Sequence, residues 1–349
     1  MEEVSNTLKN TKNNVGPGAD GFTGSFYKVF WCYIKWIVLG TIHKIFDNRE
    51  LTISVRLGII ALIPKSDKDR KFILNWRPLT LLETLFKILS LTLAARLNPV
   101  LDNLLGHEQK TYVLGRYIAE CTRNIFTYAK NNNLPGMLLL CDFEKAFDSV
   151  NFEFILTTLD IFNFGENFKI WITLLLGMEE GKNVSAVTIT NVNVSTPFKI
   201  QRGCHQGDPI SGYLFILAIQ ILAIFLQNSK IRPYTTKHGI KHLFEIYADY
   251  LTIYMNRYKS DSRKNQENVS KNLEAIEMVF VWSGLQMNKG KTYFSIFGAS
   301  LACPRFVQML RIKWSTEFRH LGLHFGQCFT KMDQKYWDCF EKVKKELNS

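Results

Sequence analysis

Apolar residues recur along the chain with two different periods, which predicts a mixture of helices and strands. Helical spacing predicts helices over residues 22–46, 81–101, 151–163, 166–177, 210–227 and 273–282. Shorter β-prone runs predict a strand over 57–64 and hairpins over 184–200 and 244–254. The first 20 residues and the segment 256–271 are polar or charged, so we expect a flexible start and a solvated connector there.

One apolar run ends on a carboxylate. Residues 138–142 read Leu-Leu-Leu-Cys-Asp, and the polar and aromatic sequence Phe-Glu-Lys-Ala-Phe-Asp follows them. This pattern predicts a buried strand that carries Asp142 at its tip. Mg²⁺ prefers carboxylate oxygens with a phosphate beside them, so Asp142 is a candidate metal ligand. Taken alone, however, an Asp after a strand is more commonly the N-cap of the next helix.

A second carboxylate changes this interpretation. Residues 244–254 contain two β-prone runs with a tight polar break between them, which predicts a hairpin whose turn carries Asp249. Two carboxylates on neighbouring strands can converge on one pair of metal ions, and two-metal phosphoryl transfer needs that geometry. Asp142 and Asp249 together therefore favour a polymerase.

Three stretches, in this order, resemble motifs A, B and C of reverse transcriptases: Asp142 to Asp148, Gln201 to Ser211, and Tyr247 to Tyr250. The variant is similar to that of non-LTR (LINE-type) retrotransposons. Further matches extend from Gly16–Phe22 to His320–Gly322, so the resemblance covers most of the chain.

The chain departs from the family pattern at a few positions. The family has two adjacent Asp residues in motif C, and here the second is Tyr250. In motif B, His205 and Gly212 stand where the family has Arg and Pro, and Thr111-Tyr112 replaces a usual Gly-Phe.

The resemblance implies an α+β fold, the fingers and palm of a right-hand polymerase, with an antiparallel palm sheet backed by helices and a truncated thumb. It divides the chain into an N-terminal extension (1–44), a reverse transcriptase domain of fingers and palm (45–326), and the start of a truncated thumb or a tail (327–349). From its length of 349 residues alone, the chain fits one large domain or two interleaved subdomains.

The resemblance also implies roles for individual residues. Asp142 and Asp249 are expected to be catalytic and, with Phe143, to bind metal. The residues expected to bind nucleotide are Lys65, Arg77, Phe143, Phe147, Gln206, Gly207 and Lys291. The residues expected to contact template or primer are Arg116, Leu321 and Gly322.

Some of these roles have ordinary structural alternatives. In the family an aromatic at the position of Phe147 blocks a 2′-hydroxyl on the incoming nucleotide, whereas the alternative is core packing. Lys291 is expected near the leaving pyrophosphate, but it is otherwise an unremarkable exposed lysine. Lys65 and Arg77 flank a charged loop suited to gripping a triphosphate, although most such loops are simply solvated.

The activity implied is RNA-templated DNA synthesis with two Mg²⁺ ions, or Mn²⁺, on an RNA template, a DNA primer and dNTPs. The rival is a catalytically dead retroelement fragment that keeps the fold and nucleic-acid binding. It is favoured by Tyr250, by the lack of an upstream endonuclease domain and by the short thumb. A basic structural RNA-binding protein is disfavoured by the ordered motifs.

Composition agrees with this picture. The formal net charge of +12 favours an anionic partner, and 46% hydrophobic residues suffice for a large core. The seven cysteines are scattered without a C-x-x-C pair, which indicates free thiols in a reducing compartment, and His320, His324 and Cys328 lack the partners of a zinc cluster.

The N-terminal residues 1–14 are polar and charged, unlike a secretory signal. The longest apolar run, 213–226, is about 14 residues and too short for a bilayer, so it is expected to be a buried core helix. We therefore expect an intracellular protein, in nucleus or cytoplasm, with no membrane contact; its protein partners are left open.

Overall fold

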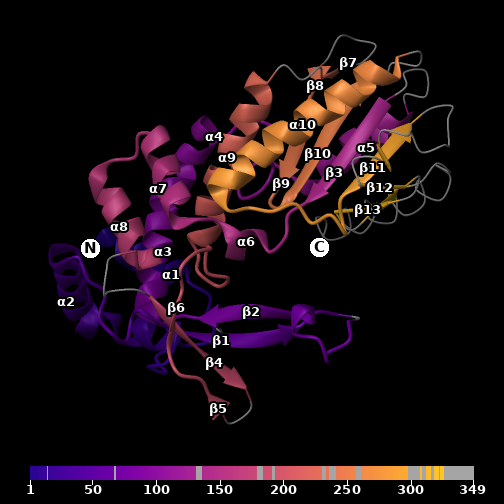
Figure 1. The fold of residues 1–349 in the computed structure, drawn as a ribbon. Helices are drawn as coiled ribbons and strands as arrows, with labels where there is room; N and C mark the ends of the chain where they lie inside the picture. The colour runs from indigo at the N-terminus through magenta and orange to yellow at the C-terminus, as the bar shows by residue number, and fades with distance from the viewer. Residues whose placement is uncertain are drawn as a thin grey trace, which may run out of the picture. The chain divides into compact units, whose positions relative to one another are not determined.

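A computed structural model of the chain describes residues 1–13, 15–66, 68–130, 136–178, 184–190, 193–229, 233–235, 241–256, 261–297, 307–308, 312–315, 318–321 and 323–325. These residues form a mixed α+β fold with two five-stranded sheets and two small two-stranded sheets (Figure 1). The coarse fold prediction is therefore confirmed.

The chain divides into two compact units, and each is assembled from separate stretches of sequence. Unit 1 contains Met1–Leu104, Lys145–Ile219 and Trp282–Gly284, and unit 2 contains Leu105–Glu144, Gln220–Val281 and Leu285–Ser349. Of the two organisations that the length allowed, the structure has the interleaved one.

Unit 1 holds most of the helices. They are α1 (Glu2–Asn10), α2 (Gly24–Asn48), α3 (Thr84–Leu97), α4 (Leu101–Leu104), α6 (Ala146–Ser149), α7 (Phe152–Ile161), α8 (Glu166–Leu176) and the first half of α9 (Ser211–Asn228), with short 3₁₀ turns at Ile73–Asn75 and Asn98–Val100. The expectation of a flexible start was wrong, because α1 buries Val4 and Leu8 and packs against α3. An ion pair of 2.6 Å between Glu3 and Arg96 adds to this contact.

The sheet of unit 1 has the order β2-β1-β4-β5, and β6 also pairs with β4. Its strands are β1 (Leu57–Pro64), β2 (Trp76–Leu81), β4 (Ser185–Thr190), β5 (Asn193–Val194) and β6 (Phe198–Lys199). β4 pairs antiparallel with β5 and β6, which confirms the predicted hairpin over 184–200, and parallel with β1. The helix predicted from residue 81 begins at Thr84 instead, since Leu81 ends β2.

The sheet of unit 2 has the order β12-β11-β3-β10-β9. Its strands are β3 (Gly136–Asp142), β9 (Phe244–Tyr247), β10 (Tyr250–Asn256), β11 (Tyr293–Phe297) and β12 (Lys313–Trp314), and only β11 and β12 run parallel. β3 is the central strand, and all seven of its residues are buried. The predicted strand at 138–142 and the hairpin over 244–254 are confirmed.

Helices cover both faces of this sheet. α10 (Ser262–Ser283) lies along one face in Figure 1, where Asn272 contacts Met255 of β10. α5 (Ile118–Lys130) contacts β9 from the other face, where Asn124 reaches Glu245. Glu245 also bonds Tyr254, and the adjacent side chains of Tyr254 and Met255 point to opposite faces of the sheet. The expected connector 256–271 was partly wrong, since α10 already begins at Ser262.

Two short hairpins complete the described part of unit 2. β7 (Tyr234–Thr235) pairs with β8 (Lys241–His242), and β13 (Phe318–His320) pairs with β14 (Leu323–Phe325). The expected thumb or tail, 327–349, lies outside the described residues.

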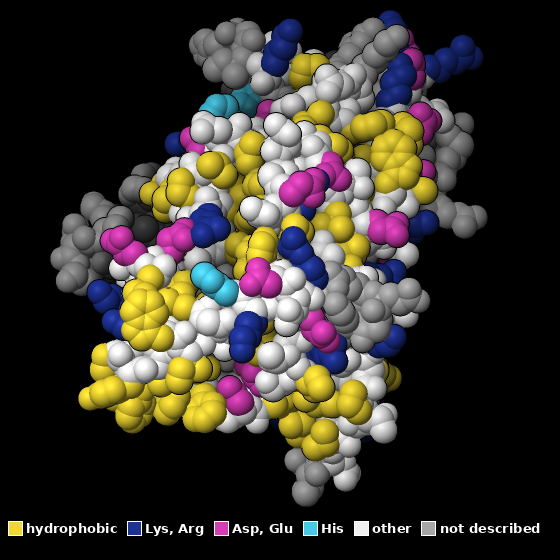
Figure 2. Space-filling view, turned by 90° about the vertical axis from the view of Figure 1, so that its left-hand side faces the viewer, with side chains coloured by type: hydrophobic (Ala, Val, Ile, Leu, Met, Phe, Trp, Pro, Cys, Tyr) yellow, Lys and Arg dark blue, Asp and Glu magenta, His cyan; other side chains and the backbone are white. Residues whose placement is uncertain are grey.

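Three helices in the described part of the chain are long and apolar enough to cross a membrane by length and composition: Gly24–Asn48, Thr84–Leu104 and Ser211–Asn228. The last two are largely buried within the fold, which accounts for their apolar character. α2 instead exposes Val29, Tyr33, Trp36 and Ile37, and Figure 2, which views the side of the molecule where α2 lies, shows large apolar side chains at the surface. The absence of membrane contact stays a prediction.

Candidate active site

The two carboxylates singled out from the sequence are brought together at one end of the unit 2 sheet. Asp142 is the last residue of β3, and Asp249 lies in the turn between β9 and β10. β10 pairs with β3 so that Tyr250 lies opposite Asp142. The backbone N–H of Phe143 then donates a hydrogen bond of 3.1 Å to the carbonyl oxygen of Asp249.

Both carboxyl groups are shifted toward their protonated forms. Burial raises the pKa of Asp142, and the Lys291 ammonium and the Tyr250 hydroxyl offset this only in part. Burial also raises the pKa of Asp249, and the negative charge of Asp142 raises it further. Two such groups disfavour each other's ionisation, so a bound cation would relieve both.

Tyr250 occupies the position where the family pattern has a second carboxylate. Its side chain lies on the same face of the sheet as that of Asp142, because residues opposite each other in an antiparallel pair share a face. Its hydroxyl hydrogen-bonds the Asp142 carboxylate. Among the described residues there is no group of three or more His, Cys, Asp or Glu side chains that could hold a metal ion.

Lys291 places a positive charge beside this pair of carboxylates. Its Nζ lies 3.5 Å from Oδ2 of Asp142, although the lysine side chain is 64% exposed. The segment is anchored because the Asn288 N–H donates to the Asp142 carbonyl oxygen at 2.8 Å. Because the Lys291 side chain is largely exposed to water, the pair contributes little to stability, and its significance is the placement of a positive charge beside a buried carboxylate.

The turn that carries Asp249 is held from outside the hairpin. Ala248 has a left-handed backbone, with φ of 51°, which costs a residue with a side chain roughly 1 kcal/mol. Its N–H donates to the hydroxyl of the buried Thr111 at 2.6 Å. The backbone of Lys110 in turn donates to the carbonyl of Ile246 at 3.0 Å. Thr111 therefore supports the conformation that places Asp249.

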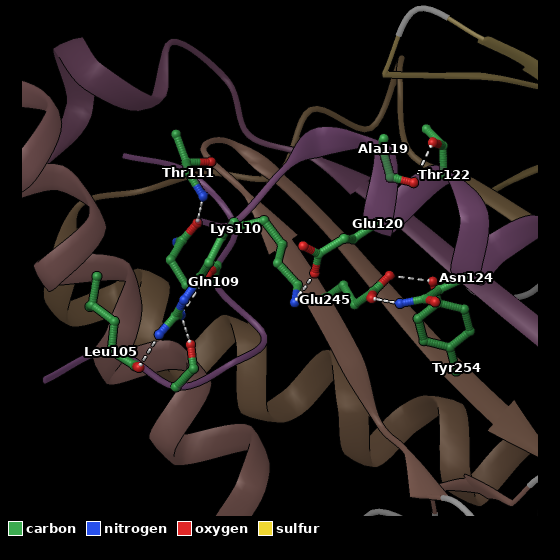
Figure 3. Close-up of polar contacts among 12 residues, drawn as sticks. Leu105, Gln109, Lys110, Thr111, Ala119, Glu120, Thr122, Asn124, Glu245 and Tyr254 are labelled. Atoms are coloured by element: carbon green, nitrogen blue, oxygen red, sulfur yellow. Dashed lines mark hydrogen bonds and ion pairs between the residues drawn. The ribbon is translucent and has the colours of Figure 1, made fainter. Parts of the chain in front are cut away.

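A buried polar cluster lies further along the same face of the sheet (Figure 3). Glu245 accepts hydrogen bonds from Asn124 and, at 2.6 Å, from the hydroxyl of Tyr254. Nearby, Lys110 forms an ion pair of 2.7 Å with Glu120. Burial raises the pKa of Glu245, with the two hydrogen bonds opposing that shift. The cluster ties α5 to the strand that leads into the Asp249 turn.

Unit 1 contains the motif B stretch, and backbone hydrogen bonds join it to residues at and just after the end of motif A. The Gly203 N–H donates to the Val150 carbonyl at 2.8 Å, and the Cys204 N–H donates to the Phe147 carbonyl at 2.6 Å. Gly203 has φ of 91°, and a Cβ there would lie 2.8 Å from the backbone of Asp148. Glycine is needed for this close approach.

The other side of the same loop rests on β2. The Thr80 N–H donates to the Gln206 carbonyl at 2.8 Å, and a Cβ on Gly207 would meet the Thr80 carbonyl oxygen at 2.5 Å. Between these contacts, burial lowers the pKa of His205 to about 4, so this residue, which stands at the family's Arg position, carries no charge at neutral pH.

Gln206 and Phe147 have side-chain partners within unit 1. The Gln206 Nε2 donates to both carboxylate oxygens of Asp148, at 3.0 and 3.2 Å. The Phe147 ring stacks on Phe215 with centroids 4.4 Å apart and remains half-buried. Packing thus accounts for one face of Phe147, and its role at the sugar stays a prediction.

Lys65 directly follows β1, and Arg77 lies on the neighbouring strand β2 of the unit 1 sheet. The Lys65 Nζ donates to the Leu74 carbonyl at 2.8 Å, and its positive charge lowers the pKa of Asp148 against the larger effect of burial. Arg77 is exposed on β2 opposite Ile63 and has no ion-pair partner among the described residues.

Phe143 and Arg116 are already engaged inside unit 2. The Phe143 ring is buried edge-on against Phe280, with centroids 5.1 Å apart, so its side chain is engaged inside the unit. The Arg116 guanidinium donates to the carbonyls of Leu105 (3.1 Å), Gly106 and Gln109 (2.8 Å). These bonds stabilise a loop, and they compete with the expected template contact.

The two residues expected on the primer side are described only in part. Leu321 forms the turn of the β13–β14 hairpin with φ of 49°, whereas Gly322 lies outside the described residues.

Comparison with known protein families identifies the family of this chain. Residues 63–325 match the family model described as reverse transcriptase (RNA-dependent DNA polymerase), which covers well over half of the chain. The chain belongs to the reverse transcriptase family. The matched segment contains both carboxylates, the motif B loop and Lys291.

Similar proteins place this reverse transcriptase among mobile elements. It is 30% identical over 254 residues to the transposon TX1 uncharacterized 149 kDa protein of Xenopus laevis, across 71% of the chain and 19% of that protein. It is 24% identical over 236 residues to the retrovirus-related Pol polyprotein from type-1 retrotransposable element R1 of Bradysia coprophila, across 65% of the chain and 22% of that protein. With the corresponding R2 polyprotein of Popillia japonica it is 29% identical over 180 residues, across 48% of the chain and 23% of that protein.

The chain spans about a fifth of the length of these relatives. The resemblance to the reverse transcriptases of non-LTR retrotransposons is confirmed.

Sequence reasoning missed three residues that support the candidate site. Thr111 was noted only as a departure from the family pattern, and Asp148 only as the end of motif A. Glu245 gave no signal beyond being a charged residue in a β-prone run. A carboxylate inside an apolar strand indicates burial with a partner, so Glu245 could have been found from that pattern.

Proposed function

We propose that this reverse transcriptase domain carries out RNA-templated DNA synthesis, with the unit 2 sheet as the palm and unit 1 as the fingers. The observation that supports this most is the juxtaposition of Asp142 and Asp249 at one end of a buried antiparallel sheet. The expected boundaries at residues 44 and 326 belong to the same proposal.

The donor set fits a divalent cation. Asp142 and Asp249 offer hard oxygen ligands, both are shifted toward protonation by burial, and the main chain of Phe143 lies beside them. These three residues would hold Mg²⁺, as two ions with the help of the nucleotide's phosphates, or Mn²⁺. The cation supplies Lewis-acid stabilisation of the reacting oxygens when bound.

The chain's own residues position the substrates. Lys291 provides a positive charge beside Asp142, suited to the charge that develops on the leaving pyrophosphate. Arg77 and Lys65 provide cations for the triphosphate, since Arg77 is exposed and free of ion pairs in the described part of the chain. In the motif B loop, Gln206 and Gly207 present polar and backbone groups to the nucleotide.

The partners and location follow from this activity. We expect an RNA template, a DNA primer and dNTPs as substrates, and an intracellular site of action in nucleus or cytoplasm. Leu321 and Gly322 are proposed to face the primer, and Arg116 to face the template, provided that it gives up bonds to the carbonyls it now contacts.

A catalytically dead fragment is the second candidate, and Tyr250 favours it. A neutral phenol, with a pKa near 10, is a poor ligand for Mg²⁺ and leaves the site short of negative charge. This candidate predicts the same fold and the same nucleic-acid binding without synthesis.

Primer extension on an RNA template separates the two. The unmodified chain, Asp142→Asn and Asp249→Asn are compared with Mg²⁺, with Mn²⁺ and with chelator. Extension that needs a divalent ion and is lost in both variants supports the polymerase. Extension equal in all three chains contradicts the assigned carboxylates, and no extension by the unmodified chain supports the dead fragment.

A further inference from the structure

The long helix α2 is anchored to the rest of unit 1 by one of its faces. Three residues that share this face are buried: Tyr27, Val38 and Ile45. The Trp31 Nε1 donates a hydrogen bond of 2.9 Å to the hydroxyl of Ser5 in α1. The Phe46 ring packs against Trp171 of α8, with centroids 5.3 Å apart. These contacts fix which face of α2 points away from unit 1.

The opposite face of α2 exposes large apolar side chains. Val29, Tyr33, Trp36 and Ile37 are each between 65% and 78% exposed, and Phe30 beside them is also exposed. Their spacing of three and four residues places them in one row along the helix, which we call the α2 stripe. Figure 2 shows apolar side chains gathered at the surface on the side where α2 lies. A single exposed apolar residue is ordinary, whereas a contiguous row indicates an interaction surface.

The charged residues beside the α2 stripe are all positive. Between Gly24 and Phe46 the helix carries lysines at positions 28, 35 and 44 and no Asp or Glu. The Lys35 ammonium lies 5.6 Å from the centroid of the Trp36 ring, so it stands at the rim of the stripe. Lys44 is exposed further along the helix. A partner that covers the stripe is therefore favoured if it brings carboxylates to this rim.

We propose that the α2 stripe is the docking surface for an amphipathic helix of a partner protein, whose apolar side packs on the stripe and whose acidic residues face Lys35 and Lys44. A row of side chains along one helix matches the row on a second helix, with the two axes about 8–10 Å apart. Gly40 lies one turn beyond Trp36, and a Cβ there would meet nothing within 4 Å, so the surface is open to close approach. The α2 stripe contains none of the residues assigned to DNA synthesis, so this proposal does not rest on the proposed function.

The charges make two other occupants less favourable. A second copy of this chain would set the lysines of one α2 against those of the other, and like charges at an interface oppose association. A helix that lies in a lipid surface keeps a cationic polar face in water, whereas the opposite face of α2 is buried in unit 1. The Lys28 ammonium is also already bound, because it donates to the side-chain oxygen of Asn13 at 2.8 Å.

Two designed helical peptides with the same leucine row test the charge and the apolar contact together. One peptide has Glu on both flanks of the row and the other has Lys, and fluorescence anisotropy measures their binding to the full chain. We expect the Glu peptide to bind at least about tenfold more tightly than the Lys peptide, because only its charges oppose those of α2. Ile37→Ser should weaken binding of the Glu peptide by about tenfold or more, since an apolar anchor is lost. Lys35→Glu should narrow or reverse the preference between the peptides.

A matched control separates the α2 stripe from exposed apolar surface in general. Ile161→Ser makes the same change at a residue of α7 that is 59% exposed in the same unit, and it should leave peptide binding unchanged. The thermal unfolding midpoint of Ile37→Ser should stay close to that of the unmodified chain, because the side chain is exposed. Should it fall, Lys35→Glu still tests the proposal, since it alters only a charge at the rim. Equal binding of the two peptides, equal losses in Ile37→Ser and Ile161→Ser, or an unchanged preference in Lys35→Glu would each overturn the proposal.

Two further measurements identify the other occupants. Sedimentation of the unmodified chain that shows a dimer, dissociated by Ile37→Ser and not by Ile161→Ser, would overturn the partner helix in favour of a second copy. Pelleting with phosphatidylserine vesicles that Ile37→Ser abolishes, without binding of either peptide, would overturn it in favour of a lipid surface. Primer extension by Ile37→Ser should equal that of the unmodified chain, so failure of the docking surface and failure of the proposed function give different results.

Discussion

At the scale of single residues, Tyr250 has two separate effects on the carboxylate pair. It removes one negative charge from the place where the family has a second Asp, and its hydroxyl occupies part of the Asp142 carboxylate through a hydrogen bond. Both effects lower the affinity for a divalent cation, the first through lost Coulomb attraction and the second through competition for a ligand oxygen.

Two substitutions at this position separate the effects. Tyr250→Phe removes only the hydrogen bond and should strengthen Mn²⁺ binding by a few-fold. Tyr250→Asp also adds a charged ligand and should strengthen it by about tenfold or more, equivalent to about 1.4 kcal/mol. Calorimetric titration of the nucleic-acid-free chain with Mn²⁺ measures both.

Stronger binding of Mn²⁺ by Tyr250→Asp should also affect DNA synthesis. Tyr250→Asp should restore some primer extension, and Asp249→Asn added to it should abolish that gain. Equal Mn²⁺ affinity of Tyr250→Asp and Tyr250→Phe would show that charge is not what the site lacks. The altered motif B loop would then be the next place to look for a defect.

At the scale of elements, the hairpin of β9 and β10 depends on a residue far away in the sequence. Ala248 keeps its left-handed conformation while its N–H donates to Thr111, which precedes it by more than a hundred residues. The two residues belong to unit 2, so this bond forms within one compact unit.

Removal of the Thr111 hydroxyl should loosen the Asp249 turn. Thr111→Val keeps the shape but not the acceptor, so the Ala248 N–H should exchange with solvent about fivefold faster, as expected for a hydrogen bond contributing about 1 kcal/mol. Thr111→Ser keeps the hydroxyl and is the matched control. Unchanged exchange in Thr111→Val, measured by hydrogen–deuterium exchange, would mean that the hairpin alone sets the turn.

The strands around the site were predictable because their patterns are local. The run that ends at Asp142 and the two runs around Asp249 each carry enough β-prone residues to identify a strand. The pairing of β10 with β3 then brings the carboxylates together. The sequence does not show that Tyr250 bonds Asp142, which depends on the register between β3 and a strand more than a hundred residues later.

The elements that were missed depend on partners distant in sequence. α1 is short and polar on average, and it is helical because Val4 and Leu8 pack against α3. The start of α10 at Ser262 was hidden in a charged stretch whose apolar positions are sparse. The link from Gln206 to Asp148 likewise joins side chains 58 residues apart, and no local period indicates it.

A buried carboxylate just before α9 should make the stability of unit 1 sensitive to pH. Asp208 is buried, accepts hydrogen bonds from Ser90, Ser211 and the Ile210 N–H, and burial raises its pKa to about 6. In the unfolded chain its pKa is about 3.9. The folded state therefore binds the proton more tightly, and stability from this group falls as pH rises through that interval.

Asp208→Asn should remove this dependence, because asparagine does not titrate and keeps an acceptor for the same donors. The unmodified chain should lose stability relative to Asp208→Asn between about pH 4 and pH 6, by up to about 3 kcal/mol, and the difference should be constant above about pH 7. Urea unfolding of both chains at several pH values measures this difference. A difference that does not change with pH would place the Asp208 pKa at its ordinary value.

At the scale of the whole molecule, charge and catalysis are separable properties. The net charge of +12 is the balance of 43 Lys and Arg against 31 Asp and Glu along the chain, whereas the candidate chemistry rests on two carboxylates. Long-range attraction to a phosphate backbone depends on the net positive charge and needs no intact metal site. The polymerase and the dead fragment therefore predict the same binding and differ only in synthesis.

Binding to an RNA–DNA hybrid should fall steeply with salt for either candidate. If the chain contacts about six phosphates, affinity should drop about a thousandfold between 50 and 200 mM salt, because bound counterions are released on association. Asp142→Asn and Asp249→Asn should keep this slope within about one unit, since each removes one negative charge near the site and no phosphate contact. Fluorescence anisotropy with a labelled hybrid measures the slope for all three chains. An affinity that does not change with salt would show that the positive charge is not directed at nucleic acid, and it would count against both candidates. A steep slope without primer extension would instead identify the site around Tyr250 as the place where function was lost.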